Sequence, residues 1–103
     1  MDKQKILITD DEPANLQLQR QILKDDYDLV FAKSGEDTLK LAVEHKPHLI
    51  LLDVMMPGMD GHEVCRRLKA DHRCDHIPVI FVTAMSDEED EAKGFQLGAV
   101  RSL

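Results

Sequence analysis

The chain has 103 residues and a formal net charge of −7, from 20 acidic and 13 basic side chains. Its length fits one domain with a modest core, and its excess of acid disfavours direct binding to nucleic acid or to an anionic membrane. No apolar run approaches the ~20 residues of a membrane span, no signal peptide is evident, and two cysteines are too few for a disulfide framework. These features favour a cytoplasmic globular domain.

Aliphatic runs alternate with amphipathic segments along the first half of the chain. Residues 5–9 predict a strand, and the acids Asp10, Asp11 and Glu12 follow it, then Pro13. Proline is favoured in the first turn of a helix, and acids complement the positive end of the helix dipole. The next expected elements are a helix over 14–24 with Leu16, Leu18, Ile22 and Leu23 inward, a strand over 27–32, and a helix over 36–44 capped by Ser34.

The stretch 49–61 combines a buried strand with a shaped loop. Residues 49–52 are aliphatic without alternation, which is typical of a strand buried on both faces of a parallel sheet, and they end at Asp53. Pro-Gly and Asp-Gly pairs then indicate turns. The rest of the chain predicts a helix over 61–70 with Val64 and Leu68 inward and Arg66, Arg67 and Lys69 in water, a strand over 78–83, a helix over 86–97 and the start of a fifth strand over 99–103.

This alternation with short connections predicts a doubly wound parallel α/β sheet with helices on both faces. The carboxyl ends of its strands meet at one edge, where such sheets place their ligand sites. That edge would bring together Asp10, Asp11, Asp53 and Thr83. Neighbouring carboxylates repel unless protons or a cation neutralise them, and hard oxygen ligands suit Mg²⁺. A cation, a carboxylate nucleophile and a hydroxyl together suit phosphoryl transfer.

The chain resembles the receiver domains of two-component response regulators, from residue 5 to about residue 99. The resemblance is carried by the acidic pair after the first strand, Asp53 with its Met-Met-Pro-Gly-Met-Asp-Gly loop, Thr83-Ala84 after the fourth strand, and Gly98-Ala99. Each motif alone is weak, but here all of them occur in the family's order and at strand ends. The resemblance implies a flavodoxin-like sheet with the strand order 2-1-3-4(-5).

The resemblance also implies a role for each residue at this edge. Asp53 would be the phosphoacceptor, receiving a phosphoryl group from a histidine kinase or phosphotransfer protein. Asp11, Asp53 and the backbone carbonyl of Met55 would bind Mg²⁺, and Asp10 would hold the ion through water. Thr83 would contact the phosphoryl group and relay the switch to an output domain or partner. Such a domain is a phospho-accepting signalling module, although family members catalyse their own phosphorylation and dephosphorylation.

The end of the sequence departs from the family pattern. The family carries a lysine and a proline after the fifth strand, beyond the position of Leu103, and an aromatic switch residue where this chain has Ser102. We therefore expect residues 1–103 to be a C-terminally truncated receiver domain, with the fifth strand and last helix missing or incomplete. An exposed edge on the fourth strand would then favour self-association. Phosphorylation without the lysine would be slow or absent.

Other interpretations stay open from the sequence. A phosphorylation-independent interaction module is compatible with the same residues. A phosphatase of the haloacid dehalogenase type would have Asp-x-Asp where this chain has Asp53-Val54-Met55, and a flavodoxin-like binding module would have a glycine- or hydroxyl-rich loop after the first strand. A zinc site lacks a standard finger spacing, and its candidate ligands are His62, Cys65, His72, Cys74 and His76.

Overall fold

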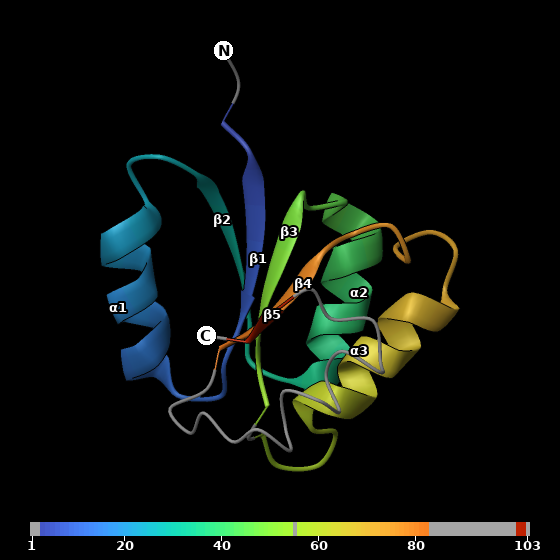
Figure 1. Cartoon of the computed structure of the whole chain (residues 1–103). Helices are drawn as coiled ribbons and strands as arrows, with labels where there is room; N and C mark the ends of the chain where they lie inside the picture. The colour runs from blue at the N-terminus through green and yellow to red at the C-terminus, as the bar shows by residue number, and fades with distance from the viewer. Residues whose placement is uncertain (1–2, 55, 83–100, 103) are drawn as a thin grey trace.

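The computed structural model describes residues 3–54, 56–82 and 101–102, in which parallel strands lie in the order β2-β1-β3-β4-β5 (Figure 1). The strands are β1 (Lys5–Thr9), β2 (Asp28–Ala32), β3 (Leu49–Asp53), β4 (Val79–Val82) and β5 (Arg101–Ser102). The helices in the described residues are α1 (Pro13–Leu23), α2 (Gly35–His45) and α3 (Gly61–Ala70). The expected doubly wound, flavodoxin-like sheet is confirmed, with its strand order.

Helices cover both faces of this sheet. Figure 1 shows α1 on one face and α2 with α3 on the other. Successive residues of β1 point to opposite faces, so Leu7 joins the cluster under α2 and α3, whereas Ile6 and Ile8 join the cluster under α1. The uninterrupted aliphatic runs of the sequence therefore reflect burial on both sides. Among the described residues, no helix has the length and apolar composition needed to cross a membrane.

The first helix buries a narrower face than its sequence predicts. Leu16 is buried and Leu23 is partly buried against the sheet. Leu18 and Ile22 are 57% and 66% exposed, so the prediction that they point inward is wrong. Each helical residue turns about 100°, which carries a side chain two positions after Leu16 to the opposite side of the helix.

The second helix has the N-cap that the sequence predicts and begins at Gly35, one residue before the predicted start. The Ser34 hydroxyl oxygen accepts a hydrogen bond from the backbone N–H of Asp37 at 3.1 Å, which confirms Ser34 as its N-cap. Glu36 and Asp37 lie in the first turn, where acids complement the helix dipole. The helix ends at His45, and Lys46 follows in a left-handed conformation with φ of 49°.

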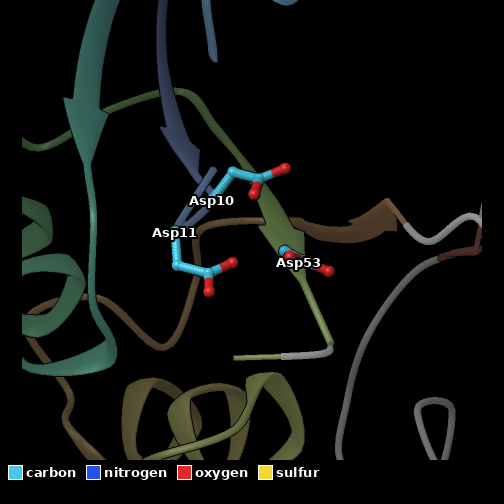
Figure 2. A group of neighbouring side chains, drawn as sticks. All are labelled: Asp10, Asp11 and Asp53. Atoms are coloured by element: carbon cyan, nitrogen blue, oxygen red, sulfur yellow. The ribbon is translucent and has the colours of Figure 1, made fainter. Parts of the chain in front are cut away.

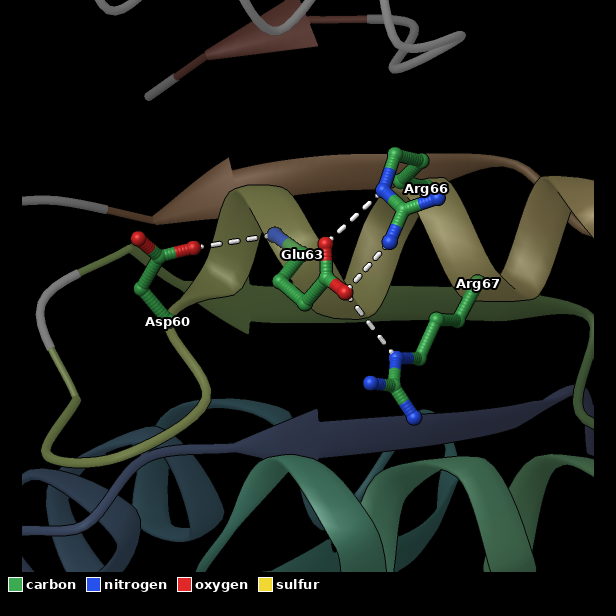
Figure 3. A network of polar contacts seen from close by, with 4 residues as sticks. All are labelled: Asp60, Glu63, Arg66 and Arg67. Carbon is green, nitrogen blue, oxygen red and sulfur yellow. Dashed lines mark hydrogen bonds and ion pairs between the residues drawn. The ribbon is translucent and has the colours of Figure 1, made fainter.

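The third helix carries an ion-pair network on its exposed side (Figure 3). A side-chain oxygen of Asp60 accepts a hydrogen bond from the Glu63 backbone N–H at 2.9 Å and so caps the helix. The Glu63 carboxylate accepts hydrogen bonds from Arg66 and Arg67, and these bonds lower the pKa of Glu63 from its ordinary 4.5 to about 2. Both arginines are exposed, as predicted.

Lys69 fastens the end of α3 to the connection before β4. Its Nζ donates hydrogen bonds to the carbonyl oxygens of Asp75 and Ile77, at 3.0 and 2.7 Å. The prediction that Lys69 simply faces water is therefore wrong. The long aliphatic stem of lysine lets the charged group reach carbonyls that a periodicity argument cannot anticipate.

A short fifth strand lies along β4. Its pairing is parallel, with Arg101 opposite Ile80 and Ser102 opposite Phe81. The predicted start of a fifth strand is confirmed, and the expectation of an unpaired outer edge on β4 is wrong at these two positions. The predicted helix over 86–97 lies outside the described residues.

Gly61 lets α3 begin directly behind the end of β3. A Cβ at this position would lie 2.4 Å from the carbonyl oxygen of Asp53 and 2.7 Å from the Cα of Val54. The Gly61 N–H also donates to the Val54 carbonyl oxygen at 3.0 Å. Since the atoms a Cβ would meet belong to the backbone, they cannot rotate away, and only glycine fits here without displacing Asp53.

The network on α3 predicts a loss of stability in acid. A carboxyl whose pKa is lower in the folded state stabilises folding while it is charged, and this contribution disappears as the pH falls from about 4.5 to about 2. Glu63→Gln should abolish this part of the acid dependence, as measured by urea unfolding across that pH range. The effect should shrink at high salt, because the network is exposed. Glu44→Gln on the exposed side of α2 is the control, and identical pH profiles for Glu63→Gln and the parent would contradict the assignment.

The contact at Gly61 predicts that substitution destabilises the fold much more at Gly61, the first residue of α3, than at Gly58 in the loop before it. Gly61→Ala should lower the free energy of unfolding by about 1–3 kcal/mol, because the methyl group overpacks against backbone. Gly58 has φ of +76° with open space around it, so Gly58→Asn should cost much less, since asparagine tolerates that conformation. Chemical denaturation measures both, and equal losses would show that the contact with β3 does not matter.

Candidate functional site

Three aspartates meet at the carboxyl edge of the sheet (Figure 2). Asp10 and Asp11 follow β1, and Asp53 is the last residue of the neighbouring strand β3. One carboxylate oxygen from each residue lies within 4.8 Å of the others. The sequence predicted that the first and third strands would bring these side chains together, and the structure places them so.

The three carboxylates have different surroundings. Asp10 is only 5% exposed, and its Oδ1 accepts a hydrogen bond from the backbone N–H of Glu12 at 2.9 Å. The backbone N–H of Asp10 donates to the carbonyl oxygen of Ala32 at 3.1 Å, which extends the pairing of β1 with β2 by one residue. Asp11 and Asp53 are partly exposed. Asp10 is therefore held inside the loop, whereas the other two carboxylates are accessible from solvent.

Electrostatics and ligand chemistry together fit a divalent cation. Unit charges separated by 4.8 Å repel by about 3.5 kcal/mol per pair at an effective dielectric near 20, and by less where water screens Asp11 and Asp53. A cation among the three would turn this repulsion into attraction. The set offers only hard oxygen atoms, which suit Mg²⁺ rather than zinc. Among the described residues, it is also the one group of three or more acidic, histidine or cysteine side chains close enough to share an ion.

Two predicted site residues, Met55 and Thr83, lie outside the described residues, so their roles stay predictions. The nearest described position of β4 is Val82, which pairs with Asp53 in the sheet register. The described end of β4 therefore lies beside the end of β3, at the same edge as the aspartates.

The zinc alternative finds no support in the described residues, because its candidates form no metal-binding group there. Cys65 and Cys74 are both fully buried. Burial raises the pKa of both thiols, which disfavours the thiolate that zinc requires. His62 is also buried and packs edge-on against the Phe81 ring, with centroids 5.2 Å apart. These side chains act as core residues.

One polar feature near the site escaped sequence reasoning. The hydroxyl oxygens of Thr9 and Thr38 lie 2.7 Å apart in a buried position, one residue before Asp10. The available signal was Thr9 itself, a hydroxyl at the end of an otherwise aliphatic strand. Nothing in the spacing identified Thr38 as its partner.

Comparison with known proteins covers nearly the whole chain. Residues 6–103 match the family described as "Response regulator receiver domain". A "Probable cyclic di-GMP phosphodiesterase" of Vibrio cholerae is 44% identical over 95 residues, which are 92% of this chain and 22% of that protein. The transcriptional regulatory protein AfsQ1 of Streptomyces coelicolor is 44% identical over 94 residues, 91% of this chain and 40% of that protein. The chain thus spans less than half the length of these relatives.

Solved structures show the same likeness. The chemotaxis protein CheY4 of Vibrio cholerae superposes with a TM-score of 0.93 at 26% identity, covering 98% of this chain and 85% of that one. The Mn²⁺-bound form of response regulator Rcp1 gives a TM-score of 0.85 at 28% identity, covering 97% of this chain and 79% of that one. The aspartate cluster, the fold and these similarities agree, and the chain belongs to the response regulator receiver domain family.

Proposed function

We propose that this chain is the phosphoacceptor of a two-component system. In this proposal a histidine kinase or phosphotransfer protein donates a phosphoryl group to Asp53 in a Mg²⁺-dependent reaction, which switches an output domain or partner. The carrying observation is the set of three carboxylates within 4.8 Å at the carboxyl edge of the sheet, in a chain of this family. The similarity to the Mn²⁺-bound form of Rcp1 adds support for a divalent ion in such a domain.

The metal site would be built from Asp11, Asp53 and the backbone carbonyl of Met55, with Asp10 acting through water. The burial of Asp10 and its hydrogen bond to the Glu12 N–H support this indirect role, because a fixed carboxylate can orient water without moving. The exposure of Asp11 and Asp53 supports direct ligation. The ion, when bound, supplies positive charge that offsets both the carboxylates and the phosphoryl oxygens.

Transfer to Asp53 is a direct displacement at phosphorus. A carboxylate oxygen of Asp53 forms the new O–P bond while the P–N bond to the donor histidine breaks, and the imidazole nitrogen keeps the electron pair and takes up a proton. The product is an acyl phosphate on Asp53. The Thr83 hydroxyl would donate a hydrogen bond to a phosphoryl oxygen and so couple the event to the end of β4.

The output stays outside this proposal, because the named relatives differ in theirs: one is a probable phosphodiesterase and one a transcriptional regulator. The net charge of −7 supports action through a protein partner rather than through direct contact with nucleic acid or a membrane. Self-association through β4 loses support at Ile80 and Phe81, since β5 already pairs there.

Labelling with a small phosphodonor tests the proposal. Incubation with phosphoramidate and Mg²⁺ should slowly add one phosphoryl group, detected by intact mass, and a chelator should abolish the product. Asp53→Asn should remove the acceptor, and Asp11→Asn should slow labelling at least about tenfold through loss of a metal ligand.

The control for both variants is Asp60→Asn, which removes a nearby charge while asparagine still caps α3. A product that persists in Asp53→Asn contradicts the proposal. Mg²⁺ binding by calorimetry without any labelling, from this donor or a phosphorylated histidine protein, favours the phosphorylation-independent interaction module instead.

A further inference from the structure

We propose that Thr9 and Thr38 are positioning residues for the aspartate cluster. Their buried hydroxyl pair would fix the end of β1, and with it the direction in which Asp10 and Asp11 project. This inference rests on the proposed function, since the ion that the cluster would bind is the Mg²⁺ proposed above.

The pair joins two layers of the fold. Thr9 is the last residue of β1 and Thr38 lies in the first turn of α2, and the two residues are 2% and 0% exposed. Their oxygens lie 2.7 Å apart, the usual length of a hydrogen bond between hydroxyls. A polar pair that is shielded from water in this way is costly to break, because neither hydroxyl can turn to solvent.

The direction of the bond follows from counting protons. The Thr38 hydroxyl donates to the carbonyl oxygen of Ser34 at 2.8 Å, and a hydroxyl has a single proton. Thr9 must therefore donate to Thr38. The chain of hydrogen bonds runs from the end of β1, through α2, to the residue that caps α2.

These bonds hold the strand end in two directions. Within the sheet, the Asp10 N–H bonds to the Ala32 carbonyl oxygen. Between the layers, the Thr9 hydroxyl bonds to Thr38 on α2. Asp10 and Asp11 come immediately afterwards, so the tether acts on the backbone that carries two of the three carboxylates. Mg²⁺ requires a nearly ideal octahedral arrangement of its ligands, and residues that hydrogen-bond to or position those ligands typically affect metal affinity.

The two threonines are not equivalent. Thr38→Val preserves shape but leaves the buried Thr9 proton without its acceptor, while the Ser34 carbonyl oxygen keeps its bond from the Thr38 N–H. Thr9→Val leaves the Thr38 proton on Ser34 and removes only a donor. The double variant removes both hydroxyls, so neither is left buried without a hydrogen-bond partner. The bond between β1 and α2 is still absent. Stability and positioning can therefore be separated.

The experiment compares the parent protein with Thr38→Val, Thr38→Ser, Thr9→Val/Thr38→Val and the control Ile77→Val, a buried residue before β4. Calorimetry measures the Mg²⁺ dissociation constant, urea unfolding measures stability, and hydrogen exchange without metal measures protection of the Asp10 amide. Thr38→Val should weaken Mg²⁺ binding by about 3- to 10-fold, a smaller loss than is usual when the mutated residue contacts a metal ligand directly. It should also speed hydrogen exchange at the Asp10 amide. Thr38→Ser should keep affinity. The double variant should regain stability relative to Thr38→Val without regaining affinity.

The inference is overturned if Thr38→Val binds Mg²⁺ within twofold of the parent, or if Thr38→Ser loses as much affinity as Thr38→Val. It is also overturned if Ile77→Val, at the same loss of stability as Thr38→Val, loses as much Mg²⁺ affinity. If the parent binds no Mg²⁺, the proposed function fails. The positioning inference is then decided by the metal-free protein, where unchanged protection of the Asp10 amide in Thr38→Val overturns it.

Discussion

Repulsion among three carboxylates is the constraint that the rest of this structure has to withstand. Asp10, Asp11 and Asp53 bring one oxygen each to within 4.8 Å of the others. At an effective dielectric near 20 and before further screening by water, this repulsion is about 3.5 kcal/mol per pair, which is large beside the roughly 5–15 kcal/mol that holds a typical domain folded. The fold can sustain this arrangement because β1 and β3 are paired on both edges and buried on both faces.

The same scaffold gives the cluster its rigidity. The backbone N–H of Asp10 continues the sheet pairing through Ala32, and the Thr9 hydroxyl connects the layers through α2. Behind Asp53, the missing Cβ of Gly61 lets α3 pack against the strand end. Such a rigid site favours the binding of a small, strongly hydrated cation, because the ligands need not rearrange when the ion binds. The aspartate cluster is thus held by the same sheet and helix contacts that build the core.

Sequence reasoning recovered the parallel sheet and the aspartate cluster, because aliphatic runs and the geometry of parallel strands determine where strand ends meet. The strand order came from the resemblance to receiver domains. Sequence reasoning failed where the answer depended on packing between elements. Apolar spacing did not show that Leu18 and Ile22 face away from the sheet, since several helix faces could satisfy the same pattern. The bond between Thr9 and Thr38 was also out of reach, because residues 29 apart meet through a register between layers that no local pattern encodes.

Thermal unfolding of the parent and of Asp53→Asn, with Mg²⁺ and with a chelator, tests the central claim most directly. In the chelator the neutral amide should make Asp53→Asn more stable than the parent, because two carboxylate pairs no longer repel. With Mg²⁺ the parent should gain stability by mass action, and the variant should gain much less. A parent that Mg²⁺ does not stabilise, or a variant that gains as much as the parent, would contradict a metal-dependent cluster at Asp10, Asp11 and Asp53.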